Sequence, residues 1–169
     1  IPIGSNISNA NGIFTISTDE KRNIWKKITT TLPSRNESFL WMIRTCLEQN
    51  KQSEAAGLMA LLRTDKIFPA RLIPALDELT AYSNYKGERY EQAAIFLAKT
   101  IPFAENRKEK SRKAYLTAQL FEKAGLNKQA QQYYQISIDA AQDPYLEIYA
   151  NVALNRLAAT NGADSKALL

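Results

Sequence analysis

The chain has 169 residues, of which 45% are hydrophobic and 23% charged, and a net charge of +5. This is the size and balance of one globular domain with a real core. It has no histidine and one cysteine, Cys46. The commonest general base, the commonest metal ligand and any disulfide within the chain are therefore excluded. We expect no catalytic site, metal or cofactor.

Charge and hydropathy also limit the classes of partner. The excess of Lys and Arg favours acidic partners or membrane surfaces only weakly, because residues of both signs are interspersed. No apolar run approaches the ~18 residues that a membrane span needs, and no signal-peptide pattern opens the chain. Because the first residue is Ile1 instead of Met, we expect a processed protein or a piece of a longer one.

The N-terminal part of the sequence changes character near residue 18. Gly, Ser and Asn punctuate residues 1–18, which predicts an irregular or extended arm, with a short strand or docking segment over 13–16. After 18, a cap-like start precedes Ile24, Trp25 and Ile28, which are spaced for one face of a helix. We expect this helix to end at Pro33.

The rest of the chain reads as helices joined by short polar links, which imply antiparallel neighbours. The expected pairs are 34–50 with 53–63, 70–85 with 90–100, and 107–124 with 128–141. Pro144 begins a further helix, expected to run to 159 and to stop before Asn161-Gly162, which leaves a flexible tail over 161–169. Cys46 falls inside an apolar helical stretch, so we interpret it as a small buried residue and not as a nucleophile.

A repeat gives the helices a common register. Small residues early in each second helix, Ala55, Ala93 and Ala130, recur at intervals of 38 and 37 residues. A tetratricopeptide unit has about 34 residues with small and aromatic residues at fixed offsets. These units are slightly stretched versions, and the last helix, which lacks a partner in view, suggests an internal portion of a longer superhelix.

The third unit matches the tetratricopeptide pattern best. Its small, aromatic and turn positions are Ala118, Phe121, Gly125, Ala130 and Tyr134. The earlier units depart from it, since Asn50 stands where Gly125 does and Asn84 where Phe121 does. We predict an all-α fold, a tetratricopeptide-like superhelix (α-solenoid) of about three antiparallel helix pairs plus flanking helices, over 19–160. The alternative is any other antiparallel helical array.

Four segments, within residues 38–157, resemble the tetratricopeptide lipoproteins of gliding motility and type IX secretion called SprE or PorW. They are Trp41-Met42-Ile43-Arg44-Thr45-Cys46-Leu47-Glu48-Gln49-Asn50, Phe68-Pro69-Ala70-Arg71-Leu72, the run from Arg112 to Gly125, and Pro144-Tyr145-Leu146-Glu147-Ile148-Tyr149-Ala150-Asn151. The resemblance implies a scaffold on the periplasmic side of the outer membrane, which binds other proteins of a secretion or envelope assembly and has neither enzyme activity nor cofactor. It also implies a longer parent chain, held to the membrane by a lipid anchor outside this segment. Without the resemblance, a cytoplasmic location is expected.

In such a stack the first helices form a concave face, and the candidate contacts with a partner lie there. The partner classes include extended peptides. In this register they are Arg44, Tyr82, Tyr85, Tyr115, Gln119 and Glu122. Each has a competing explanation: the tyrosines can pack between helix pairs, and Arg44 can form a surface ion pair. The clamp for a peptide's terminal carboxylate is not expected, because the positions that would supply it hold Leu40, Glu78 and Tyr115.

Two other functions remain open besides a generic tetratricopeptide adaptor. The basic cluster over 107–113 would suit a nucleic-acid-associated regulator, although Glu109 interrupts it and no nucleic-acid motif accompanies it, so we expect a solvated face and no nucleic acid. An enzyme is the more distant possibility. It would require carboxylates such as Glu78 and Glu122 to converge in a deep cleft.

Overall fold

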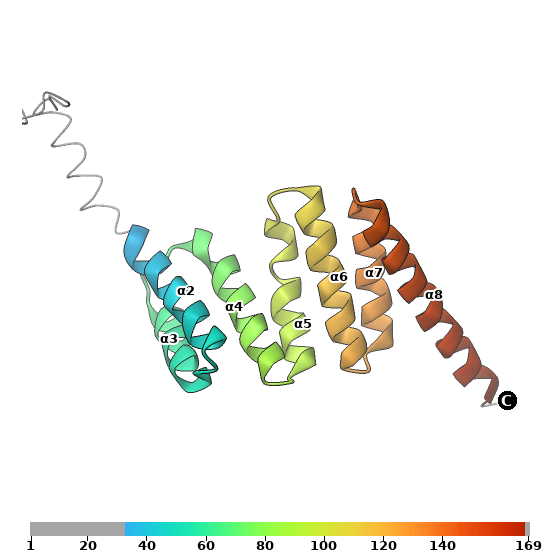
Figure 1. The fold of residues 1–169 in the computed structure, drawn as a ribbon, viewed down its shortest axis with the longest axis horizontal. Coiled ribbons are helices and arrows are strands. Elements are labelled where there is room, and N and C mark those ends of the chain that lie inside the picture. The colour runs from blue at the N-terminus through green and yellow to red at the C-terminus, as the bar shows by residue number, and fades with distance from the viewer. Residues whose placement is uncertain (1–32, 168–169) are drawn as a thin grey trace, which may run out of the picture. The chain divides into compact units, whose positions relative to one another are not determined.

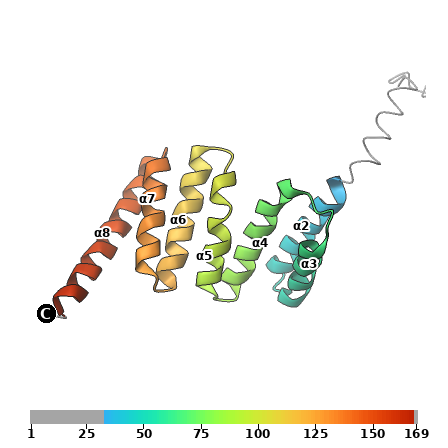
Figure 2. The ribbon, with the colours of Figure 1, turned by 180° about the vertical axis from the view of Figure 1, so that it is seen from behind.

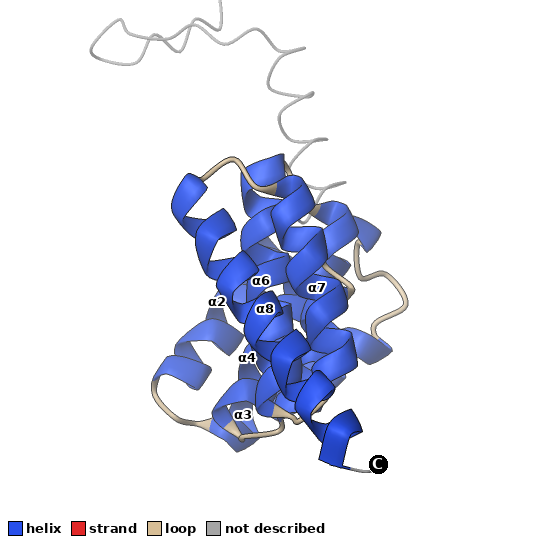
Figure 3. Ribbon diagram, turned by 90° about the vertical axis from the view of Figure 1, so that its right-hand side faces the viewer, coloured by secondary structure: helices blue, strands red, loops and turns tan. Residues whose placement is uncertain are grey.

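The computed structural model describes the backbone of residues 33–167 and the side chains of 35–159. The chain divides into two units, Ile1–Asn36 and Glu37–Leu169, and the description below concerns the second. The arm expected over 1–18 and the helix expected over 19–32 lie outside the described residues. Every regular element within those residues is helical, so the predicted all-α class is confirmed for that part of the chain (Figure 3).

The helices follow one another along the chain and pack against their neighbours (Figure 1). They are α2 (Pro33–Glu48), α3 (Gln52–Thr64), the 3₁₀ turn η1 (Ala70–Leu72), α4 (Ile73–Lys86), α5 (Tyr90–Ala98), the 3₁₀ turn η2 (Ile101–Phe103), α6 (Arg107–Lys123), α7 (Asn127–Ala140) and α8 (Pro144–Ala167). Seen from behind, α4 to α8 keep the same side-by-side order (Figure 2). Short turns join α2 to α3, α4 to α5 and α6 to α7, which makes three hairpins.

The main correction to the predicted elements concerns the last helix. The Asn161-Gly162 pair does not end it, because α8 continues to Ala167 and covers most of the tail expected over 161–169. One Gly inside a helix costs only about 1 kcal/mol. No proline follows to break the helix, and alanines and a lysine continue it.

The three hairpin turns have the same backbone geometry. After the first helix of each pair, one residue adopts the left-handed conformation. These residues are Asn50, Glu88 and Gly125, with φ values of 60°, 58° and 76°. The next residue has φ between −91° and −83° and ψ between 64° and 69° in all three turns, and the second helix then begins. The left-handed residues recur at intervals of 38 and 37 residues, the same intervals that separate Ala55, Ala93 and Ala130.

Backbone hydrogen bonds repeat in the same register. In each turn, the amide that precedes the second helix donates to the carbonyl five residues earlier: Lys51 to Cys46 at 2.8 Å, Arg89 to Asn84 at 2.9 Å, and Leu126 to Phe121 at 2.9 Å. This six-to-one bond over a left-handed residue is the Schellman arrangement, which satisfies carbonyls at a helix end. The sequence varies at the turn, but the backbone does not.

Packing between paired helices explains the small residues of the pattern. Ala55, Ala93 and Ala130 have no exposed surface, and neither has Ala118 on α6. An alanine at these places allows helix axes to approach closely. Two turns before Ala118, the hydroxyls of Ser111 on α6 and Ser137 on α7 each donate to the other residue's backbone carbonyl, at 2.8 and 2.9 Å.

Buried side chains form two cores within this unit. One, centred on Ile43, Leu47 and Leu62, joins α2, α3 and the start of α4. The other, around Phe121 and Tyr134, joins α5 to α8. The outward face of α8 also carries exposed large apolar side chains at helical spacing, Tyr145, Ile148, Tyr149 and Val152. That helix is therefore apolar on two faces: one packs into the second core, and the other is exposed.

Candidate functional site

A pocket of about 660 Å³ lies where the first helices of successive pairs, α4 and α6, meet α8. α4 supplies Glu78, Ala81, Tyr82 and Tyr85, α6 supplies Tyr115, Leu116, Gln119, Leu120, Glu122 and Lys123, and α8 supplies Ala153 and Arg156. Leu97 of α5 and Tyr134 of α7 complete the lining. The mixture of aromatic, aliphatic and few charged groups suits binding.

The pocket brings together five of the six residues that the repeat register singled out. The positions are Tyr82, Tyr85, Tyr115, Gln119 and Glu122. They come together because residues three and four apart share one face of a helix and because α4 and α6 occupy equivalent places in their hairpins.

The sixth candidate, Arg44, lies outside the pocket lining. It is exposed on α2, with its guanidinium carbon 5.8 Å from the ring centroid of Trp41. Arg44 and Trp41 therefore form a cation–π contact at the surface, which accounts for the position of Arg44 without a partner protein.

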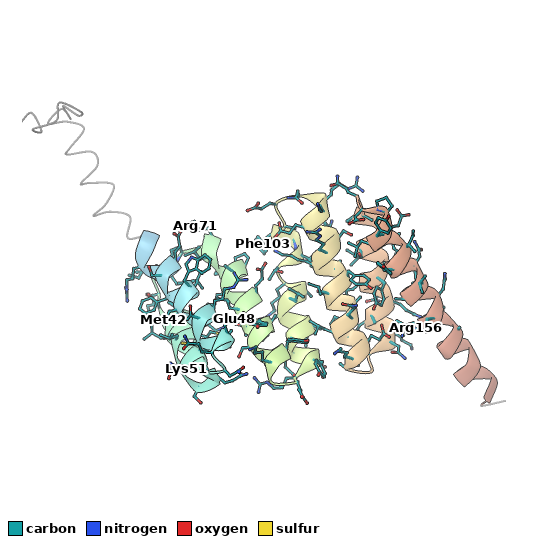
Figure 4. The ribbon with its side chains drawn as sticks, viewed as in Figure 1. Met42, Glu48, Lys51, Arg71, Phe103 and Arg156 are labelled. Carbon is teal, nitrogen blue, oxygen red and sulfur yellow. The ribbon has the colours of Figure 1, made fainter. Side chains whose placement is uncertain are left out.

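A polar network closes the α8 side of the pocket. Tyr134 donates to one oxygen of Glu122 at 2.8 Å, and Arg156, labelled on α8 in Figure 4, binds the other oxygen at 2.5 Å. The ring of Tyr115 meets that of Tyr134 edge-on at 5.5 Å. Burial, and then the hydrogen bond to Glu122, raises the pKa of Tyr134. Burial and the charge of Glu122 also raise the pKa of Tyr115.

A second cluster of charged side chains includes Glu78 of the pocket lining. Lys113 of α6 binds Glu78 of α4 at 2.5 Å and Glu109, one turn earlier on its own helix, at 2.7 Å. Burial alone would lower the pKa of Lys113, but the two carboxylates outweigh it and the net pKa is raised. The pKa of Glu109 is lowered by its bonds to Lys113 and to the Glu105 amide.

These contacts belong to a series that joins each first helix to the next. Tyr82 of α4 donates to Glu48 of α2 at 3.2 Å, Lys113 of α6 binds Glu78 of α4, and Arg156 of α8 binds Glu122 of α6. The partners are 34 or 35 residues apart in each case. Two of these ion pairs join the helices that line the pocket, α4 to α6 and α6 to α8.

The two carboxylates that would be needed for acid–base chemistry, Glu78 and Glu122, do line the same pocket. Each already forms an ion pair with a cation of a neighbouring first helix, so both serve to hold the walls in place. Among the described residues, no group of three potential metal ligands is present. Cys46 is buried inside α2, as expected, with its Sγ 3.8 Å from a Glu54 oxygen.

Comparisons with protein-family models, with curated proteins and with solved structures found no match. Comparison identifies no family. Among the described residues, none of the helices combines the length and the apolar character that a membrane span requires.

Lys123 and Arg156 are the charged pocket-lining side chains that the sequence did not single out. Arg156 was missed because its pairing with Glu122 depends on how α8 packs, and no local spacing encodes that. Lys123 had a visible signal: it lies one residue after Glu122 on the last turn of a first helix, next to a predicted contact. Its ammonium nitrogen is 5.1 Å from the ring centroid of Tyr90 and 6.0 Å from that of Tyr85.

The basic cluster over 107–113 is only partly available to a ligand. Lys113 is held by two carboxylates, and Arg107 donates to the Asp139 carbonyl at 2.7 Å. Lys108, Lys110 and Arg112 are exposed. The cluster lies at the start of α6, where Asn106 accepts a hydrogen bond from the Glu109 amide as a helix cap.

Proposed function

We propose that this chain is a non-catalytic, tetratricopeptide-type repeat module that binds a segment of another protein in the pocket over α4, α6 and α8. One observation carries the proposal: residues chosen from the repeat register alone lie together around one pocket. The recurring turn geometry and the buried alanines support the repeat itself.

The dimensions of the pocket suit a short extended peptide. It is lined by residues of three first helices, α4, α6 and α8, and an extended chain, which covers about 3.3 Å per residue, spans such a row with few residues. Tyr82, Tyr85 and Tyr115 offer rigid apolar area together with hydroxyls that can bond to a peptide backbone.

The biological setting of the proposal comes from the sequence resemblance to the SprE and PorW lipoproteins. We propose a scaffold of type IX secretion or gliding motility on the periplasmic side of the outer membrane, with secretion or envelope proteins as partners. If that resemblance fails, the same pocket serves a generic adaptor. A nucleic-acid regulator is less favoured, because the apolar pocket would then have no role and part of the 107–113 cluster is internally bonded.

A retention experiment with the whole 169-residue chain tests the proposal. The pocket variant is Gln119→Trp, because Gln119 is exposed and its replacement fills the pocket without disturbing the core. Gln132→Trp, at an exposed position of α7 outside the pocket lining, is the matched control. We expect envelope proteins of the source organism to be retained by the wild-type chain and by the control, and lost with Gln119→Trp.

Three results would count against parts of the proposal. Retention of nucleic acid alone, lost when Lys108, Lys110 and Arg112 are reversed in charge, would favour the regulator. Equal retention by the pocket variant and its control would remove the pocket from the account. Partners drawn only from the cytoplasm would exclude the envelope setting but leave the adaptor.

A further inference from the structure

The charges that line the pocket are matched within the protein, with one exception. Glu78 is paired with Lys113, and Glu122 is paired with Arg156. Lys123 also lines the pocket, but no carboxylate of the described residues lies within 4.0 Å of its ammonium group. One positive charge is therefore left for an incoming ligand.

The surroundings of Lys123 hold that charge in place. Its ammonium lies against the rings of Tyr90 and Tyr85, which themselves meet at 6.2 Å between centroids. Ring faces attract a cation without accepting conventional hydrogen bonds from it. An ammonium has three donors, so it can still bind a carboxylate while the rings limit its movement. Less side-chain entropy is then lost on binding.

Next to Lys123 the pocket is apolar. Leu97, Leu116 and Leu120 line it, and Leu116 is about half exposed. Ala81 and Ala153 leave space where a larger side chain would fill it. This surface suits a large aliphatic or aromatic side chain, because burying apolar area against it is favourable.

We infer that the pocket recognises a segment of a partner protein in which an Asp or Glu adjoins a large apolar residue. This inference rests on the proposed function and names its class of ligand. The carboxylate binds Lys123, and the apolar side chain lies over the leucines. A basic segment would place like charge beside Lys123, and a free phosphate or a nucleic acid would leave the apolar surface uncovered.

The test begins with a peptide-display selection against the full chain. Selected peptides that lose binding to Gln119→Trp are synthesised, each with an analogue in which Asp or Glu is replaced by its amide. Affinities are then measured for the wild-type chain, for Lys123→Gln and for Lys128→Gln, an exposed lysine on α7 that does not line the pocket. Circular dichroism confirms that each variant is folded.

The expected result is a charge preference that depends on Lys123. An exposed ion pair contributes up to about 1 kcal/mol, so the acidic peptide should bind the wild-type chain and Lys128→Gln roughly threefold to fivefold more tightly than its amide. The ratio should fall to about one in Lys123→Gln, and in the wild-type chain it should shrink as salt is added.

Failure of this inference and failure of the proposed function have different signatures. Pocket-dependent peptides without acidic residues, or an acid-to-amide ratio that survives Lys123→Gln, would overturn the inference and leave the module intact. A selection in which no peptide is enriched, or none depends on the pocket, would contradict the proposed function itself.

Discussion

Two glycines test the repeated turn by the same chemical change. Gly57 lies inside α3, and Gly125 lies in the turn after α6 at φ = 76°. At both positions a Cβ atom would meet nothing within 4 Å, so replacement by alanine creates no clash. The two variants therefore differ chiefly in backbone conformation.

The structure predicts opposite signs for the two replacements. Gly57→Ala should raise the free energy of unfolding by about 1 kcal/mol, because glycine is that much less favourable than alanine inside a helix. Gly125→Ala should lower it by about 1 kcal/mol, because the left-handed conformation costs an L residue roughly 1–2 kcal/mol and the gain from reduced chain entropy offsets part of this cost.

Urea unfolding followed by circular dichroism at 222 nm measures both changes. At this chain length, 1 kcal/mol corresponds to a shift in Tm of about 2–4 °C, so thermal unfolding provides a second readout. If Gly125→Ala proved as stable as the wild-type chain or more stable, the left-handed turn in this register would be refuted.

Three further predictions concern stability. Glu88→Gly should stabilise the chain by about 1 kcal/mol, because Glu88 holds the same left-handed position at φ = 58°; urea unfolding checks this. Ser111→Ala and Ser137→Ala should each cost about 1 kcal/mol, and the double variant should cost about their sum, since each hydroxyl donates to a backbone carbonyl that the other substitution keeps. Tyr134→Phe should cost about 1–2 kcal/mol at pH 7. Because the pKa of Tyr134 is raised in the folded state, its contribution to the free energy of unfolding is present below pH ~10 and is lost as pH rises further. Tyr134→Phe should therefore flatten the alkaline loss of stability in a pH series. An unchanged slope would contradict that assignment.

The sequence was sufficient to predict much of the local fold. Ala55, Ala93 and Ala130 located the three hairpins because only a small residue allows the helices to approach there, and all three are fully buried. The turns were harder to predict. Gly87 has φ = −88°, and the neighbouring Glu88 takes the left-handed conformation, because the hydrogen-bonded turn fixes the position whichever residue occupies it. The predicted end of α8 was wrong, because the Asn161-Gly162 pair weakens a helix without terminating it.

The site was less predictable than the fold. The register identified Tyr82, Tyr115 and Gln119 because they lie on equivalent faces of first helices. It could not identify Leu97 or Arg156, which reach the pocket from α5 and α8 through tertiary packing. No periodicity within one helix encodes a contact between residues 34 apart, such as that between Glu122 and Arg156.

Site-specific photo-crosslinking tests the central claim most directly. A benzophenone amino acid is placed at Gln119 in the pocket, and a matched one at Gln132 on the exposed face of α7, in the full chain mixed with envelope extract. We predict that a discrete protein crosslinks at 119 and not at 132, and that an acidic peptide chosen by the pocket competes with it. The same crosslinked species at both positions, or none at 119, would contradict a binding site over α4, α6 and α8.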